Sequence, residues 1–261
     1  MKNRLKLNSS KSHFMVITSS QRRTHHETEF CLNLGLSEVT SSSEERVLGI
    51  QIGNSLASWK VQIDFSSRGV IPKCSKKLAG LKLVGKYLSF KKRRVTGQSV
   101  VLSRLFYCVE VWGPGLTLTQ LRALQACMNR LTRWITQNPV GTSVSQDLME
   151  CGFLSVNQTI VFRVLITGLL ALKYGKPVGI RELLKPTQHG FNTRGSQAQV
   201  CTVIDSYYSN KSWKNKFVKY LNKLPESLKY SDMKNKAEKD ELKLWIKNNV
   251  VKFPRCSEEM L

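Results

Sequence analysis

The sequence predicts an α+β protein that is mostly helical. Short segments rich in β-branched and apolar residues, with turn-forming residues nearby, lie within the first 63 residues. From about residue 64 onward the spacing of apolar residues changes from two to near 3.6, which is typical of helices. At 261 residues, 41% of them apolar, the chain is long enough for one large or two small domains with a core. We expect three parts, over residues 1–63, 64–137 and 138–261.

The first part is expected to hold three short strands. Residues 12–18 and 46–52 are β-branched and apolar, and residues 30–34 alternate apolar with polar or small side chains. Residues 41–45 contain three serines and two glutamates, which is typical of a solvated loop. The last strand is expected to end in a turn at Gly53-Asn54.

Two helices are expected next, over residues 76–90 and about 97–111. In the first, apolar residues share one narrow arc of the helix, and Lys82 and Lys86 lie on its flank. Gly113-Pro114-Gly115 ends the second helix. The residues of the arc are Leu78, Leu81, Val84, Gly85 and Leu88.

A third helix begins at a threonine that can cap it, either Thr117 or Thr119, and ends before Asn138-Pro139. The joints that follow are short, so we expect the middle of the chain to form a helical bundle. The remaining expected helices cover residues near 143–150, residues 156–174 and residues 232–249.

The net charge limits the class of partner. The chain has 41 lysines and arginines against 18 acidic residues, a formal net charge of +23 and a pI near 10.0. A charge this lopsided is unusual for a metabolic enzyme, and it favours attraction to a polyanion, either a nucleic acid or an acidic membrane.

The position of the charge favours nucleic acid. The 45 residues between Asp64 and Glu110 carry 11 basic side chains and no acidic one, so the i,i+4 ion pairs of an ordinary solvated helix cannot form there. A countercharge from outside is the economical explanation, because Lys and Arg contacts to phosphates gain from released counterions. Residues 91–94 also fit a nuclear-localisation patch. The expected phosphate-contacting residues are Lys76, Lys77, Lys82, Lys86, Lys91, Lys92, Arg93, Arg94 and Arg104.

The cysteines and the apolar runs indicate an intracellular protein, in the nucleus or the cytoplasm, and not a secreted one. The seven cysteines are an odd number, widely spaced and without a Cys-x-x-Cys pair. The apolar run near the N-terminus, Phe14–Ile17, is too short for a signal peptide. The longest apolar run, residues 160–172, contains Arg163 and is shorter than the ~20 residues of a membrane span, so we expect a buried core helix and no membrane partner.

Catalytic and metal motifs are weak. Gly80–Tyr87 nearly matches a phosphate-binding P-loop, but tyrosine stands where Ser or Thr should reach Mg²⁺, and the segment lies within a helical pattern. His25-His26 with Glu27 and Glu29 matches no closed zinc site. No Gly-x-Ser-x-Gly elbow is present, and no two of the five aspartates are adjacent. We therefore expect no catalytic residue and no metal site in this chain.

Leu7-Asn8-Ser9-Ser10-Lys11-Ser12, followed by apolar residues 14–17, resembles the segment after the catalytic loop in reverse transcriptases of non-LTR retrotransposons of the jockey-like or LINE type. Val47-Leu48-Gly49-Ile50 is similar to that family's Leu-Gly strand near the primer-holding hairpin. The resemblance covers most of residues 5–246 and is strongest over 5–135. Its further motifs are Phe30–Gly35 with Val39, Leu56-x-x-Trp59-x-x-x-Ile63 with Gln62 where histidine is common, Val111-Trp112-Gly113, Leu124-Gln125 with Arg130 and Arg133-Trp134-Ile135, Asn192-Thr193-Arg194 and Asn222–Leu228.

The resemblance implies end-of-palm strands over 1–63, a basic thumb-like region over 64–137 and a post-thumb region over 138–261. In the family, an upstream carboxylate and an Asp-Asp pair hold the Mg²⁺ ions, and these should lie before residue 1. The resemblance thus implies the C-terminal part of an RNA-directed DNA polymerase that lacks the catalytic carboxylates and holds no cofactor of its own. It would be inactive alone and would bind RNA, DNA or an RNA–DNA hybrid, with a possible protein partner that supplies the missing half.

Two alternatives stay open. The chain fits a co-opted, non-enzymatic helical interaction or scaffold protein whose charge meets an acidic partner. It also fits the unstable product of a decayed element, because strands without their sheet partners leave exposed edges.

Overall fold

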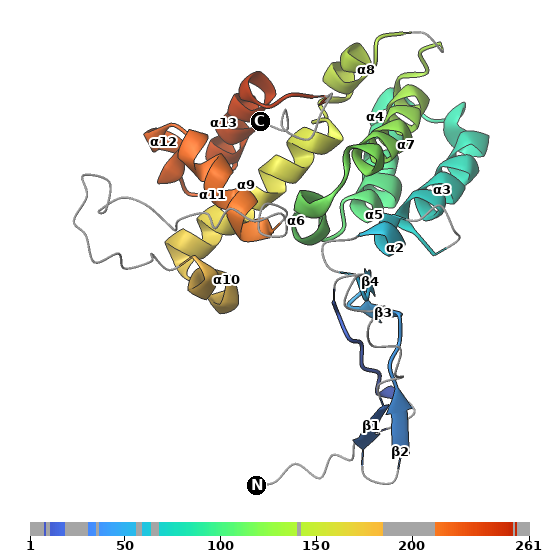
Figure 1. Cartoon of the computed structure of the whole chain (residues 1–261). Helices are drawn as coiled ribbons and strands as arrows, with labels where there is room; N and C mark the ends of the chain where they lie inside the picture. The colour runs from blue at the N-terminus through green and yellow to red at the C-terminus, as the bar shows by residue number, and fades with distance from the viewer. Residues whose placement is uncertain are drawn as a thin grey trace, which may run out of the picture. The chain divides into compact units, whose positions relative to one another are not determined.

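The computed structural model describes residues 8, 11–18, 31–34, 37–55, 59–63, 68–139, 142–184, 212–252 and 254. The chain divides into two compact units, Met1–Gly69 and Val70–Leu261, which are described separately (Figure 1). The described residues are mainly helical and contain two small antiparallel sheets, which confirms the α+β, mostly helical class. Almost all of the expected second and third parts, residues 64–137 and 138–261, belong to the second unit.

The first unit contains two β-hairpins. Strand β1 (Cys31–Leu34) pairs with β2 (Ser37–Thr40), and β3 (Glu44–Val47) pairs with β4 (Ile50–Gly53). The prediction of one strand over 46–52 is wrong, because Leu48 (φ 49°) and Gly49 (φ 90°) form a tight turn in its middle. A two-residue turn with both φ values positive fits the twist of a hairpin. The sequence hides this turn because an exposed leucine occupies the position where asparagine is usual.

The other strand predictions have mixed outcomes. Residues 31–34 form β1 as expected, whereas residues 12–18 make only isolated parallel bridges, Phe14 to Ser41 and Thr18 to Ser55. Part of the expected loop over 41–45 belongs to β3. The short helix α2 (Lys60–Ile63) packs on β4, where the Gln51 N–H donates to Gln62 Oε1 at 2.8 Å. Gln62 is 7% exposed, and its hydrogen bond to Gln51 joins α2 to the β3–β4 hairpin.

A helical hairpin opens the second unit. Helix α3 (Val70–Gly85) turns back at residues 86–89 into α4 (Phe90–Gly97), which continues through a π-helical turn (Gln98–Leu102) into α5 (Ser103–Leu105). The Cys74 thiol lies 3.8 Å from the Val101 carbonyl oxygen, which places the start of α3 beside the end of the returning helix. Helix α3 begins six residues before its expected start at 76. Helix α4 begins seven residues before the expected start at 97, and the sequence conceals this because residues 91–94 are all basic and show no apolar spacing. The second one ends at Leu105, and a separate short helix, α6 (Val109–Trp112), follows.

Helix α7 (Leu118–Thr136) packs against both arms of the hairpin. Of the two candidate caps, Thr117 is the one used: its Oγ1 accepts the Gln120 N–H, and Gln120 Oε1 accepts the Thr117 N–H. The contact with α3 is close, since a Cβ at Gly85 would lie 2.4 Å from Trp134 Nε1. Gly85 therefore permits the approach of the two helices.

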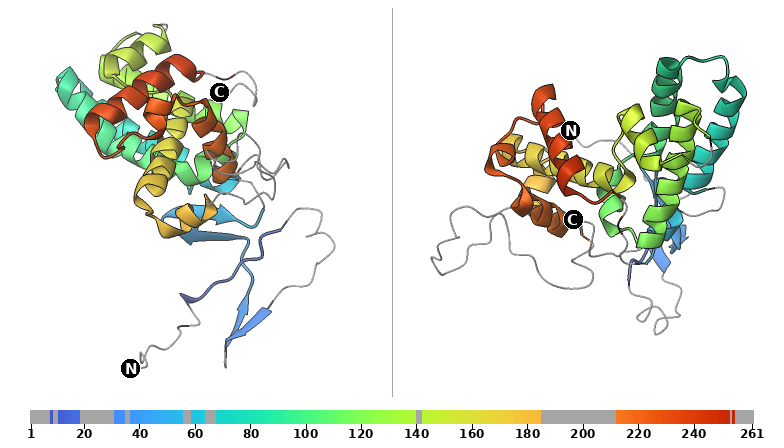
Figure 2. Two further views of the ribbon diagram at one scale, coloured as in Figure 1. Left: turned by 90° about the vertical axis from the view of Figure 1, so that its left-hand side faces the viewer. Right: turned by 90° about the horizontal axis from the view of Figure 1, so that it is seen from above.

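Helix α9 (Val156–Tyr174) is the centre of the remaining helices and has the bounds expected from the sequence. It contacts α6, α7, α10 (Val178–Leu183), α11 (Trp213–Lys223) and α13 (Lys236–Asn249) (Figure 1, Figure 2). Among the described residues it is the one helix whose length and apolar composition would suit a membrane span, and 56% of that stretch is buried inside the protein. Helix α8 (Val144–Cys151) also agrees with the sequence, whereas α11 and α12 (Glu226–Lys229) were not expected.

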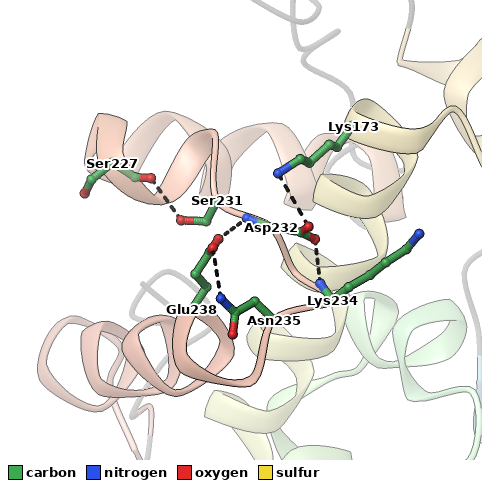
Figure 3. A network of polar contacts seen from close by, with 7 residues as sticks. All are labelled: Lys173, Ser227, Ser231, Asp232, Lys234, Asn235 and Glu238. Atoms are coloured by element: carbon green, nitrogen blue, oxygen red, sulfur yellow. Dashed lines mark hydrogen bonds and ion pairs between the residues drawn. The ribbon is translucent and has the colours of Figure 1, made fainter.

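A polar network connects the end of α9 with the segment between α12 and α13 (Figure 3). Lys173 Nζ lies 3.9 Å from an Asp232 oxygen, and the Asp232 N–H donates to Glu238. The Lys234 N–H donates back to Asp232 at 2.9 Å. A hydrogen bond from the Tyr174 hydroxyl, together with the Lys234 N–H and nearby lysines, lowers the pKa of Asp232. In this network Asp232 is paired with Lys173, and Glu238 accepts the Asp232 N–H and a hydrogen bond from the Asn235 side chain.

Candidate nucleic-acid interface

The basic residues expected to contact phosphates lie mainly on the surface of the α3–α5 hairpin. Of the nine, all except Arg93 are exposed, and Arg93 is half-buried. Helix α3 carries Lys76, Lys77 and Lys82, and the turn after it carries Lys86. The returning helix carries Lys91, Lys92, Arg93 and Arg94 on α4 and Arg104 on α5.

Helix α3 buries a different set of apolar residues from the one expected from the sequence. Val70, Ile71, Cys74, Leu78 and Gly85 are buried, and of these only Leu78 and Gly85 belong to the arc expected from the sequence. Leu81 is only half-buried, however, and Val84 is 46% exposed. The arc predicted from the sequence is thus wrong at Val84, because α3 begins earlier and its buried face is set by contacts near its start.

The exposed basic side chains have no described acidic partner. The ion pairs among the described residues join His13 to Glu45, Lys173 to Asp232 and Lys243 to Asp240, so none of them includes one of the eight exposed basic side chains named above. Glu110 on α6 is the one acidic residue between residues 65 and 146. The positive charge of this surface is therefore not neutralised by carboxylates in the part of the chain that the structure describes.

Arg93 differs from its neighbours because its guanidinium is used inside the fold. Nε donates to the Ile135 carbonyl at 2.8 Å, and Nη1 donates to the carbonyls of Leu88 at 2.5 Å and Gly85 at 3.5 Å. Ile135 lies in the last turn of α7 and Gly85 ends α3, where carbonyl groups have no partner within their own helix. Arg93 on α4 thus ties together the ends of α3 and α7 and the turn at Leu88, and its expected role as a phosphate contact stays untested.

Two other basic residues contact aromatic rings. Lys86 Nζ lies 4.9 Å from the centre of the Tyr87 ring, and the Arg94 guanidinium lies 5.9 Å from that of Phe153. Both distances suit cation–π attraction. Lys86 and Arg94 remain exposed in these positions, so both can also meet a phosphate.

Two buried cysteine thiols lie where the hairpin packs on α7: Cys74 is on α3 and Cys127 is on α7. The hydrogen bond between them and their burial raise the pKa of Cys74, whereas that same hydrogen bond lowers the pKa of Cys127 to about 7. The positive charge of Arg104 acts on Cys74, and that of Arg130 acts on Cys127. Arg104 follows Val101 by three residues, and the Val101 carbonyl oxygen is 3.8 Å from the Cys74 thiol, so exposed basic side chains occur both at the turn with Lys86 and toward the open end of the hairpin.

The structure also bears on the motifs that sequence reasoning set aside. Gly80–Gly85 lies inside α3, so this segment forms no phosphate-binding loop between a strand and a helix. The His25-His26 motif, Leu56 and residues 192–194 lie outside the described residues. Within the described ranges no group of three His, Cys, Asp or Glu side chains is placed to hold a metal ion.

Sequence reasoning missed exposed apolar side chains beside the lysines. Leu83 and Tyr87 are each 77% exposed. Leu83 follows Lys76 by seven residues, two helical turns, so a helix that begins at Val70 places it on the outer face. This signal becomes visible only once the start of the helix is known.

Comparison of the chain with protein-family models, with curated proteins and with solved structures gave no match.

Proposed function

We propose that the α3–α5 hairpin binds nucleic acid without sequence preference, as RNA, DNA or an RNA–DNA hybrid. The observation that carries the proposal is the set of eight exposed basic side chains on one helical hairpin, with no described carboxylate in an ion pair with any of them. Such a surface gains free energy from a polyanion because each phosphate contact releases condensed counterions.

The length of α3 supports binding of an extended polyanion. Helix α3 has 16 residues and is about 24 Å long at ~1.5 Å per residue. A duplex carries one negative charge per ~1.7 Å of its axis, so several phosphates fall within that length. The acidic side chains Glu226, Glu238, Asp240 and Glu241 lie instead on α12 and α13, apart from the hairpin in the chain.

We further propose that the chain is a C-terminal part of a non-LTR retrotransposon reverse transcriptase, with the hairpin as its thumb-like region. Sequence motifs over residues 5–246 support this proposal, as does the order of small β-hairpins followed by basic helices. The chain would have no polymerase activity alone, since no two of its aspartates are adjacent. Mg²⁺-dependent primer extension by the purified chain would contradict this part of the proposal.

The binding proposal is tested by removing charge from the hairpin. The variant Lys91→Gln/Lys92→Gln is compared with Lys236→Gln/Lys247→Gln, which removes the same charge from exposed positions of α13. Near 0.1 M salt, the loss of two phosphate contacts should weaken binding of a labelled RNA–DNA hybrid by roughly 25- to 60-fold. Fluorescence anisotropy measures this loss.

The control variant should bind within about twofold of the unchanged protein, because its charges lie outside the interface. Equal losses in the two variants would show that net charge alone, and not the hairpin, determines binding.

A further inference from the structure

The tip of the hairpin, residues 82–92, exposes apolar side chains next to each other. Leu83 and Tyr87 are 77% exposed and Val84 is 46% exposed. Single exposed apolar residues are common on protein surfaces, but three within five residues form a patch.

Four exposed lysines lie in the same segment as this patch. Lys82, Lys86, Lys91 and Lys92 all lie within the tip, and Lys86 Nζ is 4.9 Å from the centre of the Tyr87 ring. No acidic residue occurs between 65 and 109. The tip therefore combines an aromatic ring, aliphatic side chains and positive charge without a negative group.

The helix surface beside the patch is also open. Ala79 and Gly80 are exposed, and a Cβ placed on Gly80 would meet no atom within 4 Å. A partner can thus approach the backbone of α3 closely at this point.

We propose that the hairpin tip holds unpaired nucleotides: a base stacks on Tyr87 beside Leu83 and Val84, and the neighbouring lysines bind the adjoining phosphates. The proposal rests on the nucleic-acid binding proposed above and names the form of nucleic acid that the tip takes. Aromatic rings flanked by cations are the usual means by which proteins bind single strands without reading sequence, because every base has a flat apolar face.

Unpaired nucleotides fit the tip better than a duplex does. In a duplex the faces of the bases are stacked inside, so phosphates alone would meet the tip, and Leu83 and Tyr87 would gain nothing. An acidic membrane also attracts lysines with apolar side chains. Exposed basic residues, however, also lie outside the tip, at Lys76 and Lys77 on α3 and at Arg104 on α5, and a linear polyanion matches that extension better than an apolar tip inserted in a bilayer.

The test compares the unchanged protein with Tyr87→Ala and with Tyr87→Phe, which keeps the ring. The probe is a single strand of about 16 nucleotides, near the upper length that one single-strand-binding module covers, with a central 2-aminopurine. The same sequence as a blunt duplex serves as the second probe. Anisotropy gives affinity, and 2-aminopurine emission reports stacking directly.

We expect Tyr87→Ala to weaken single-strand binding by about 5- to 160-fold, the range for loss of one stacked base, and to remove the quenching of 2-aminopurine. Duplex affinity and the salt dependence of binding should stay unchanged, and Tyr87→Phe should behave as the unchanged protein. An equal effect on both probes, or none on the single strand, would overturn the proposal while leaving salt-dependent binding intact.

Vesicles with and without anionic lipid distinguish the membrane alternative. If the protein bound anionic vesicles and Tyr87→Ala abolished that binding without altering single-strand affinity, the tip would be a membrane contact and the proposal would be wrong. If the unchanged protein bound neither probe, the proposed nucleic-acid function itself would fail.

Discussion

Four adjacent basic residues, 91–94, are equivalent in the sequence and unequal in the structure, and this difference can be tested by substitution. The change Arg93→Met keeps most of the aliphatic stem and removes the guanidinium. The comparison is Lys92→Met, which removes one charge from an exposed position on the same helix.

The expected cost of Arg93→Met follows from its hydrogen bonds. Two are short, to the Ile135 carbonyl at 2.8 Å and the Leu88 carbonyl at 2.5 Å, and the bond to Gly85 at 3.5 Å is marginal. A hydrogen bond to a charged group contributes ~1.5–3 kcal/mol, and water can replace part of it at this half-buried site, so we expect a loss of about 2–4 kcal/mol. For a unit of this size, that lowers the melting temperature by roughly 5–15 °C.

Thermal melting followed by circular dichroism measures the effect. Lys92→Met should melt within about 2 °C of the unchanged protein, because exposed side chains without partners contribute little to stability. Its affinity for nucleic acid should fall instead. If Arg93→Met melted with the unchanged protein and lost as much affinity as Lys92→Met, the reasoning that separates Arg93 from its neighbours would be refuted.

Further predictions concern the helical core and the polar network. Gly168→Ala should destabilise the protein by about 1–3 kcal/mol in a denaturant titration, because the added Cβ would lie 2.1 Å from the Phe217 ring. Gly80→Ala is the matched control in open space and should stabilise by ~0.5–1 kcal/mol, and equal effects would contradict the packing. Asp232→Asn should lower the melting temperature at pH 7. Since the folded state holds the pKa of Asp232 below its ordinary 3.8, its contribution exists above that pH and is lost as the pH falls through the lowered folded-state value. The two melting curves should therefore converge in strong acid, and a difference that persisted there would contradict the pairing.

The sequence predicted best the elements with strong local signals. The bounds of α9 follow from its apolar run, and the start of α7 follows from a threonine cap at one of two candidate positions, of which Thr117 is used. The predictions failed where tertiary contacts or unusual backbone decide. Leu48 and Gly49 form a turn inside an apolar run, and α4 begins within a block of basic residues.

The sequence predicted the positive charge of the candidate interface, but it predicted only in part which side chains are exposed there. The run of basic residues without acids is plain in the sequence, and eight of the nine expected side chains are exposed. The different use of Arg93 could not be predicted, because it depends on the ends of α3 and α7 meeting beside α4. The exposure of Tyr87 likewise depends on the hairpin turn that follows α3.

The salt dependence of binding tests the central claim most directly. The affinity for an RNA–DNA hybrid is measured over a series of salt concentrations, and log K is plotted against log salt concentration. If the hairpin binds phosphates, the slope should be clearly negative, no steeper than about −7 for eight contacts, and should become shallower by roughly 1.4–1.8 in Lys91→Gln/Lys92→Gln. A flat plot, or the same slope in the variant, would contradict the account.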